Sequence, residues 1–486
     1  MHTPNISYSE TFKEKLVATL QSFFTLIENN LDSHSIELIK KALVMAEYGH
    51  QHQSRKSGEP YIIHPLSVAY IVAQWGLIDT NTIIGALLHD TIEDTTISKT
   101  EISKEFGSNV ANIVDSLTKL DAFKFKSKEH AHAEYIKKLI ITMETDIRVI
   151  LIKLADRTHN IQTLAFMKPA KQISISKETL EIYVPIAYQL GLYKLHIELA
   201  EQCFKYVYPL RYKLLVSSLN RSQLANKDIH QQIKKEIESH LQHHGLSPQI
   251  LTTPYSFYKL YQRIKHQSKK FDYKYYSIEF KIIVEQIEQC YATLGLVHNL
   301  FQPIPDKFKD LIAIPRANGY QSLHTMLIAH NITIFIQIRT KTMHKISEYG
   351  LVNKLINSQQ KNNRMADSLI SNVMAIKQSN ESSAINFLKI LKNNLSIVYV
   401  FTSDRQIVYL PCGSSVLDFA YLVDENLGNK IAKVKINHKF TSIFYKLKNG
   451  DLIDIITAEY IYPQKSWLKH VVTNKAYNNI IKQIKN

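Results

Sequence analysis

The feature of this chain that most constrains its fold is the stretch 60–95, PYIIHPLSVAYIVAQWGLIDTNTIIGALLHDTIEDT. Its apolar residues are dense enough for a buried segment, yet His64 lies near its start and the pair His89-Asp90 directly follows an apolar run. Burying ionisable groups is costly unless a cation or polar partners compensate for it. The chain must therefore fold so that these side chains share a partner.

Segment 81–92, NTIIGALLHDTI, predicts a buried helix that carries His89 and Asp90. Adjacent residues lie about 100° apart around a helix, so both side chains can lean toward one ion. Glu93 and Asp94 follow these two residues at a spacing of four, so each acid shares a helix face with its partner.

A second stretch, 146–164, has the sequence DIRVILIKLADRTHNIQTL and predicts an apolar-striped helix. Asp156, His159 and Asn160 fall on one face of it. Asp156 is the natural fourth member of the His/Asp set, and we expect His159 behind the ligands or in packing. A lone His-Asp pair is usually structural, but this larger set of imidazoles and carboxylates indicates a metal-dependent phosphohydrolase.

A predicted loop precedes His64, because Gly58, Pro60 and Pro65 interrupt the helical pattern there. The same loop holds two cations and a hydroxyl, from Arg55, Lys56 and Ser57. Such groups suit a phosphate or a purine ring. A solvated loop explains them as well, so both interpretations stay open.

Composition limits the partners. The net charge of +16 and the pI near 9.3 favour acidic partners such as nucleotides or RNA, although a general bias toward Lys, Ile and Asn explains the charge equally well. The three cysteines are scattered at no metal-ligand spacing. No apolar run approaches the roughly 20 residues of a membrane span, so we expect a soluble, cytoplasmic protein with no membrane partner.

Several blocks in the first half resemble the hydrolase half of the RelA/SpoT-homologue family, whose members make and destroy the alarmones ppGpp and pppGpp. These blocks are RKSGEPYIIHP, ALLHDTIEDT, DSLTKL, DIRVILIKLADRTHNIQTL and ETLEIYVPIAYQLG. The resemblance runs to about residue 460 and implies a multidomain α plus α+β protein. Its parts would be an all-α HD-superfamily hydrolase domain, a degenerate mixed α/β synthetase-like domain and a β-grasp TGS domain. The expected limits are 1–200 for the hydrolase domain, 201–250 for a helical connector, 251–350 for the synthetase-like domain, 351–394 for a linker, 395–460 for the TGS domain and 461–486 for a helical tail.

The resemblance also implies roles for individual residues. One divalent ion, usually manganese, would be held by His64, His89, Asp90 and Asp156. Glu93 and Asp94 would orient or deprotonate the attacking water. The nucleotide pocket would be lined by Arg55, Lys56, Ser57, Asn160 and Thr163.

The second region keeps only part of the family's synthetase pattern. The blocks FKDLIAIPRANGYQSLHT and IQIRTKTMHKISEYG survive. By resemblance they form a relic guanine pocket from Tyr320, Gln337, Arg339, His344 and Glu348. The cationic and acidic residues that hold ATP and magnesium are replaced by Thr253, Tyr255, Tyr276 and Phe335. Phosphoryl-type transfer depends on such cations and metal-bound carboxylates, so we expect synthesis to be lost.

The third region contains VYVFT, LPCGSSVLDFAY and YKLKNGDLIDIIT, which resemble a TGS module. In the family this module contacts tRNA or other regulators, and Lys430, Lys433, Lys435 and Lys439 would suit such a contact. A solvated lysine face explains them equally well. A ribosome, tRNA or regulator is thus a possible partner, and no DNA is expected.

The leading hypothesis is manganese-dependent hydrolysis of ppGpp and pppGpp to GDP or GTP and pyrophosphate. Three alternatives stay open: a guanine-nucleotide sensor built on the relic pocket, a non-catalytic tRNA or ribosome partner, and an HD phosphohydrolase acting on another nucleotide.

Overall fold

A computed structural model describes residues 10–121, 145–350 and 397–485, with short breaks at 226, 255, 267–277, 317–319, 405–406, 412, 449 and 460–462, and a few positions between 135 and 142. The predicted linker 351–394 and Cys412, Tyr255 and Tyr276 lie outside the described residues. The chain divides into two compact units, 1–123 with 145–363 and 124–144 with 364–486. Each is described by itself.

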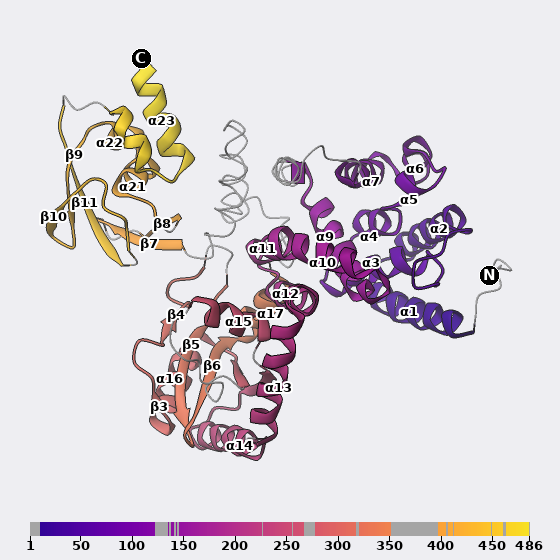
Figure 1. The fold of residues 1–486 in the computed structure, drawn as a ribbon, viewed down its shortest axis with the longest axis horizontal. Helices are drawn as coiled ribbons and strands as arrows, with labels where there is room; N and C mark the ends of the chain where they lie inside the picture. Colours follow the sequence, from indigo (N-terminus) through magenta and orange to yellow (C-terminus); the bar gives the residue numbers. More distant parts are fainter. Residues whose placement is uncertain are drawn as a thin grey trace. The chain divides into compact units, whose positions relative to one another are not determined.

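The first half of unit one is helical, as predicted (Figure 1). Its helices are α1 (Glu10–Glu28), α2 (Ser33–Gly49), α3 (Ile63–Gln74), α4 (Thr80–Leu87), α5 (Thr91–Asp94), α6 (Lys99–Phe106), α7 (Ser108–Asp121) and α9 (Ile147–Gln162). α3 contacts α1, α4 and α9, and most residues of α3 and α9 are buried. At Gly85 a Cβ atom would lie 2.8 Å from Ile113 Cγ2, so α4 and α7 approach too closely there for a larger residue.

Further helices continue to the middle of the chain. They are the 3₁₀ turn Leu164–Phe166, α10 (Pro169–Glu178), the π turn Thr179–Tyr183, α11 (Val184–Gln189), α12 (Tyr193–Val207), α13 (Pro209–Ala225) and α14 (Lys227–His243). The expected domain limit at residue 200 falls inside α12. α14 is helical as expected, and its Ile233, Ile237 and Leu241 are fully buried against the sheet that follows.

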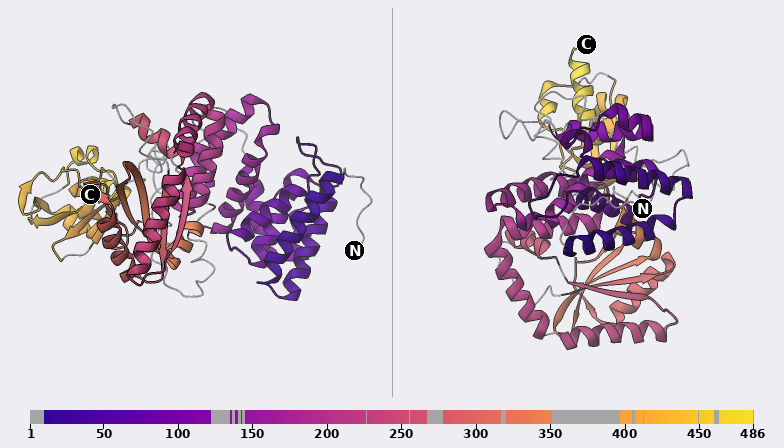
Figure 2. Two further views of the ribbon diagram at one scale, coloured as in Figure 1. Left: turned by 90° about the horizontal axis from the view of Figure 1, so that it is seen from below. Right: turned by 90° about the vertical axis from the view of Figure 1, so that its right-hand side faces the viewer.

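That sheet forms the second half of unit one, with strand order β1-β2-β6-β5-β3 and β4 paired to β5. Its strands are β1 (Gln249–Pro254), β2 (Ile278–Val284), β3 (Gln302–Pro303), β4 (Lys309–Asp310), β5 (Leu323–Ala329) and β6 (Ile332–Thr340), and its other helices are α15 (Phe257–His266), α16 (Ile287–Leu300) and α17 (Lys341–Tyr349). β2 and β6 are parallel, whereas β1–β2 and β5–β6 are antiparallel. Figure 2 shows the twist of this sheet and the helices beside it.

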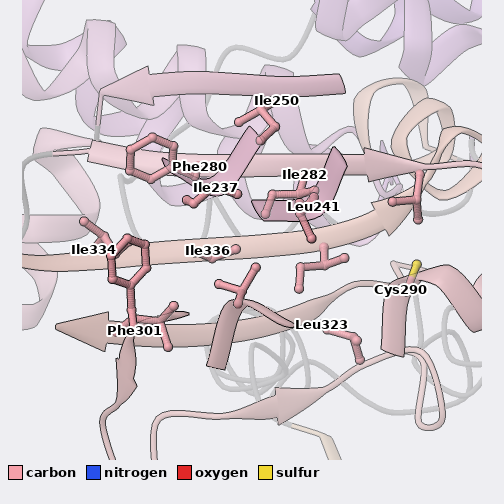
Figure 3. Close-up of a cluster of buried hydrophobic side chains, with 14 of the residues drawn as sticks. Ile237, Leu241, Ile250, Phe280, Ile282, Cys290, Phe301, Leu323, Ile334 and Ile336 are labelled. Carbon is pink, nitrogen blue, oxygen red and sulfur yellow. The ribbon is translucent and has the colours of Figure 1, made fainter. Parts of the chain in front are cut away.

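The two faces of this sheet differ because successive strand residues point to opposite sides. Phe280, Ile282, Ile334 and Ile336 are buried in one apolar cluster, together with residues of α14 and α16 such as Cys290 (Figure 3). Most of the alternate residues on β2 and β6 are polar or charged, such as Glu279, Lys281, Gln337 and Arg339, and the exceptions are Ile283 and Phe335. The sheet thus has an apolar face and a polar face.

Unit two holds a second sheet with strand order β10-β9-β11-β7-β8, in which β7 and β11 are parallel. Its elements are β7 (Ile397–Thr402), β8 (Ile407–Pro411), α21 (Val416–Val423), α22 (Glu425–Asn429), β9 (Ile431–Ile436), β10 (Lys439–Thr441), β11 (Asp451–Thr457), the 3₁₀ turn Lys465–Lys469 and α23 (Asn474–Lys485). α21 packs its buried face on this sheet. The predicted fold class is confirmed: a helical region, a mixed α/β region and a small β-grasp region follow one another.

The environment of His196 on α12 predicts that acid destabilises unit one. Burial lowers the pKa of His196 to about 4, and the charges of Lys259 and Arg316 add to the shift. The unfolded chain takes up this proton near pH 6.5 and the folded chain only near pH 4. The neutral His196 ring therefore makes its full contribution to the free energy of unfolding above pH 6.5. This contribution, up to about 3 kcal/mol, is lost as the pH falls toward 4.

Melting temperatures measured at pH 7.5 and pH 5 test this expectation. His196→Gln keeps a donor for the Val184 carbonyl, 3.0 Å from Nδ1, and should reduce the acid-induced drop. His52→Gln, at an exposed position in the 50–62 loop, should leave the drop unchanged. Equal drops in wild type and His196→Gln would contradict the assignment.

Candidate metal centre

The four predicted ligands come from three places in the helical region. His64 is the second residue of α3, Asp156 lies in the middle of α9, and His89 and Asp90 lie between α4 and α5. The predicted continuous helix over 81–92 is wrong, because α4 ends at Leu87 and a separate helical turn starts at Thr91.

Local hydrogen bonds explain this break. The Thr91 hydroxyl donates to the Leu88 carbonyl at 2.6 Å, and the His89 ring donates through Nδ1 to the Ala86 carbonyl at 2.8 Å. These side chains satisfy carbonyls that a continuing helix would use. The turn, rather than a helix face, therefore places His89 and Asp90 side by side.

The four side chains converge on one point. His64 Nε2 lies 3.4 Å from Asp90 Oδ2 and 3.3 Å from Asp156 Oδ1. His89 Nε2 lies 3.1 Å from Asp90 Oδ1 and 4.0 Å from Asp156 Oδ1. Ligand atoms of His64, His89 and Asp90 all lie within 4.8 Å of one another, which is a spacing that one cation can bridge.

The rings are oriented as metal ligands require. Because a carbonyl only accepts, His89 Nδ1 carries the proton toward Ala86, and a neutral ring then has its lone pair on Nε2. That Nε2 atom is buried and makes no hydrogen bond of acceptable geometry with any described residue. On the other ring, His64 Nδ1 pairs with His159 Nδ1 at 2.8 Å, so His159 lies behind the ligand, as predicted. The donor set fits a divalent ion bound by imidazole and carboxylate.

The pKa values of His89 and Asp90 in the site depend on one another's charges. Burial alone would raise the pKa of Asp90, but the imidazoles of His89 and His64 hold it well below its usual range. Burial would lower the pKa of His89, whereas the carboxylates of Asp90 and Asp156 raise it to about 9. The carboxylates thus attract positive charge at this point, which is the property that a cation site needs.

Lys153 was not predicted as part of the site. It is 5% exposed, and its ammonium donates to Asp156 Oδ2 at 2.9 Å. Burial would raise the pKa of Asp156, but Lys153 and then His64 hold it well below its usual range. The spacing of three residues on α9 was the available signal, since such residues are neighbours on a helix.

The two acids predicted to handle water lie on α5, and both are exposed. Asp94 Oδ2 lies 3.1 Å from the hydroxyl of Tyr61, a residue that sequence reasoning did not single out. The same hydroxyl donates to Asp90 Oδ2 at 2.8 Å. Asp94 therefore lies at the rim of the ligand cluster, and Glu93 is its neighbour in the chain.

The predicted pocket residues lie along the same rim. Arg55 Nη2 donates to Asn160 Oδ1 at 2.8 Å, and Asn160 Nδ2 donates to Asp156 Oδ1 at 2.6 Å. The Ser57 hydroxyl oxygen is buried and has no hydrogen-bond partner among the described residues. Lys56 is exposed, and the Thr163 hydroxyl donates to the His159 carbonyl at 3.1 Å.

The predicted relic pocket lies on the polar face of the second region. Tyr320 is 4% exposed, and its hydroxyl donates to Gln337 Oε1 at 3.2 Å. Arg339 is 1% exposed, and its Nη2 lies 3.7 Å from Glu348 Oε1, which is also 3.9 Å from His344 Nδ1. These five residues do come together.

A side chain of the helical region packs against Tyr320 of the predicted relic pocket. The rings of Tyr193 and Tyr320 have centroids 5.4 Å apart, and Arg316 lies 5.5 Å from the Tyr320 centroid. Lys259 in turn donates to the Tyr193 hydroxyl at 2.5 Å. Sequence reasoning missed this cluster because its members are distant in the chain.

Phe335 on β6 faces Glu279 on β2, in register. Glu279 is 7% exposed and accepts a hydrogen bond from Gln337 Nε2. Thr253 on β1 is the register partner of Glu279 on the other side. The polar face thus holds one buried carboxylate, which sequence reasoning missed, beside the phenylalanine.

In unit two, Lys433 and Lys435 lie on β9, Lys439 on β10, and Lys430 just before β9. The Lys435 ammonium lies 5.0 Å from the ring centroid of Phe440, which is 65% exposed. Lys433, Lys435 and Lys439 thus lie on two paired strands, and the ring of Phe440 beside Lys435 is exposed.

The described helices include none long and apolar enough to cross a membrane. Three family models match the chain. The model described as an HD domain matches residues 42–193, the one described as a region found in RelA / SpoT proteins matches 254–390, and the one described as a TGS domain matches 398–457.

Curated relatives match nearly the whole chain. It is 38% identical over 464 residues to a guanosine-3′,5′-bis(diphosphate) 3′-pyrophosphohydrolase of Vibrio cholerae, covering 94% of this chain and 66% of the relative. It is 37% identical over 478 residues to the bifunctional (p)ppGpp synthase/hydrolase SpoT of Escherichia coli, covering 96% of this chain and 67% of the relative. It is 35% identical over 464 residues to a guanosine-3′,5′-bis(diphosphate) 3′-pyrophosphohydrolase of Borreliella burgdorferi, covering 94% of this chain and 69% of the relative. The chain spans about two thirds of the length of these relatives.

Proposed function

We propose that this chain, which belongs to the RelA/SpoT family, is a guanosine-3′,5′-bis(diphosphate) 3′-pyrophosphohydrolase. It would cleave the bond between the 3′ oxygen and its pyrophosphate in ppGpp or pppGpp, with water as the second reactant and GDP or GTP and pyrophosphate as products. The observation that carries this proposal is the convergence of His64, His89, Asp90 and Asp156 in the region that matches HD domains.

The chain's own residues divide the work. His64, His89, Asp90 and Asp156 would hold a divalent ion. The ion supplies positive charge that lowers the pKa of water and neutralises phosphate oxygens. Asp94, exposed at the rim 3.1 Å from the Tyr61 hydroxyl, would accept a proton from the attacking water, and Glu93 would orient that water.

The loop before α3 would bind the nucleotide. Arg55 and Lys56 would supply cationic donors for the phosphates, and the Ser57 hydroxyl, which is buried without a hydrogen-bond partner among the described residues, would bind a ligand oxygen. The hydrogen bonds from Arg55 to Asn160 and from Asn160 to Asp156 link this loop to the ligand cluster. Thr163 follows at the end of α9. Nucleotide and ion would thus bind side by side.

Manganese is the proposed ion, because a mixed set of imidazoles and carboxylates suits a metal between the hard oxygen-seeking and softer nitrogen-seeking ions. Purified protein stripped with a chelator is expected to leave ppGpp intact. Added Mn²⁺ should restore release of pyrophosphate and GDP, measured by chromatography, with Mg²⁺ alone as the comparison. Full activity in the stripped protein would contradict metal dependence, and inactivity with Mn²⁺ would contradict the proposed reaction.

We further propose that the second region does not synthesise alarmone. Phe335 occupies a position where the family has a carboxylate, and Thr253 stands in place of a cation. Glu279 is the carboxylate nearest in register, but it is buried and hydrogen-bonded to Gln337. Aromatic side chains cannot bind magnesium in place of carboxylates.

Two alternatives are weaker on these observations. A nucleotide sensor would need an open face of Tyr320, and Tyr193 packs against that ring. A different nucleotide substrate is disfavoured because the loop RKSGEPY resembles that of the RelA/SpoT hydrolases, which act on ppGpp. A tRNA, ribosome or regulator remains a proposed partner of the TGS region, through its lysines and Phe440.

We also propose limits for the domains of the chain. The hydrolase domain would occupy residues 1–200, the connector 201–250, the synthetase-like domain 251–350 and the TGS domain 395–460. The matches at 42–193, 254–390 and 398–457 support this order.

A further inference from the structure

We propose that Tyr61 is a positioning residue that holds Asp94 against the metal ligand Asp90, and so couples the ion site to the group that receives the proton from water. The expected effect of Tyr61 on the rate of hydrolysis rests on the proposed pyrophosphohydrolase function. The expected effect of Tyr61 on ion binding rests on the geometry of the ligand cluster alone.

The Tyr61 hydroxyl is shared between two carboxylates. It lies 2.8 Å from Asp90 Oδ2 and 3.1 Å from Asp94 Oδ2. A phenol has one proton to donate, so the two carboxylates share a single bifurcated hydrogen bond, and this proton reduces the repulsion between the two acids. Asp90 belongs to the ion site and Asp94 to its exposed rim, and the hydroxyl sets the distance between them.

Two side chains contact the ring of Tyr61. The His50 ring stacks on it, with centroids 4.5 Å apart and planes 20° apart, and the Arg55 guanidinium lies 5.6 Å from the ring centroid. His50 is itself held through Nδ1, which lies 2.8 Å from Gln53 Oε1. A ring held in this way can place its hydroxyl within about 0.5 Å.

Asp94 needs such a support, because α5 is a single helical turn and the Asp94 side chain is exposed. A second contact fixes its backbone, since Gln53 Nε2 donates to the Asp94 carbonyl at 2.6 Å. Both supports come from the loop that carries Arg55. Loop 50–62 therefore does two tasks: it presents the proposed nucleotide-binding cations and it positions the carboxylates.

The test variant is Tyr61→Phe, which keeps the stacked ring and removes only the hydroxyl. We expect kcat for ppGpp hydrolysis to fall by about ten- to a hundredfold and Mn²⁺ affinity to fall by about tenfold, as losses of groups that orient metal ligands do. The KM for ppGpp should change little, because the loop cations remain. Tyr48→Phe is the matched control, since Tyr48 is 70% exposed on α2, and it should behave as wild type.

Mn²⁺ titration by calorimetry, steady-state kinetics and a melting curve are measured on the full chain. The melting curve shows whether Tyr61→Phe is folded, and a folded variant with wild-type kcat and Mn²⁺ affinity overturns the proposal. A change confined to KM also overturns it. If wild type fails to hydrolyse ppGpp, the proposed function falls, yet the titration still decides the role of Tyr61: weaker Mn²⁺ binding in Tyr61→Phe supports it, and equal binding overturns it.

Discussion

Asp90→Ala is expected to reduce ppGpp hydrolysis by about a thousandfold, because a catalytic ion contributes several kcal/mol and each 1.4 kcal/mol is worth about tenfold in rate. Asp90 contacts both imidazoles of the cluster: one oxygen lies 3.1 Å from His89 Nε2 and the other 3.4 Å from His64 Nε2. Removing it leaves the imidazoles with only one of the two carboxylates that attract the ion. The measurement is release of GDP from ppGpp at saturating Mn²⁺.

The matched control is Asp115→Ala. Asp115 lies on α7 in exposed ion pairs with Lys99 and Lys119, and such pairs contribute little to stability. The Asp115→Ala variant should hydrolyse ppGpp like wild type. Mn²⁺ should raise the melting temperature of wild type and Asp115→Ala but not that of Asp90→Ala. Near-normal hydrolysis by Asp90→Ala would contradict the assignment of the site.

Asp156→Ala is expected to lose activity to a similar degree and, in addition, to destabilise the helical region. The Asp156 carboxylate faces the buried Lys153 ammonium at 2.9 Å and accepts from Asn160 at 2.6 Å. Removing one partner of a buried ion pair costs about 3–5 kcal/mol, since the remaining charge stays in a poorly solvated place. Because one kcal/mol shifts the melting temperature of such a domain by about 2–4 °C, we expect a drop on the order of ten degrees without metal.

A double variant separates the two effects. Asp156→Ala with Lys153→Met replaces the buried pair by apolar groups, which is often neutral for stability. It should recover most of the melting temperature and none of the hydrolysis. An Asp156→Ala protein as stable as wild type, or a double variant that regains hydrolysis, would contradict the paired role of Asp156 in charge balance and ion binding.

The sequence predicted which side chains converge better than it predicted the path of the chain that carries them. Imidazoles and acids beside dense apolar runs had to share a partner, and His64, His89, Asp90 and Asp156 do converge. The helix predicted through 81–92 failed because periodicity does not register the hydrogen bond from the Thr91 hydroxyl to Leu88. Local side-chain competition for backbone groups ended the helix.

Other features required the fold. The hydroxyl of Tyr61 meets acids about thirty residues further along the chain, and the ring of Tyr193 meets Tyr320 from a different region. No spacing rule covers such contacts, because tertiary packing alone sets them. Glu279 was overlooked for a related reason: its importance comes from facing Phe335 in a parallel strand pair.

The central claim is that this chain removes alarmone and does not make it. The most direct measurement runs both assays on one preparation: ppGpp with Mn²⁺ for hydrolysis, and ATP plus GDP with Mg²⁺ for synthesis. Asp90→Ala is included in the second assay so that hydrolysis cannot hide newly made ppGpp. We predict that wild type converts ppGpp to GDP and pyrophosphate and that neither protein forms ppGpp from ATP and GDP. Accumulation of ppGpp by Asp90→Ala, or ppGpp left intact by wild type, would contradict the account.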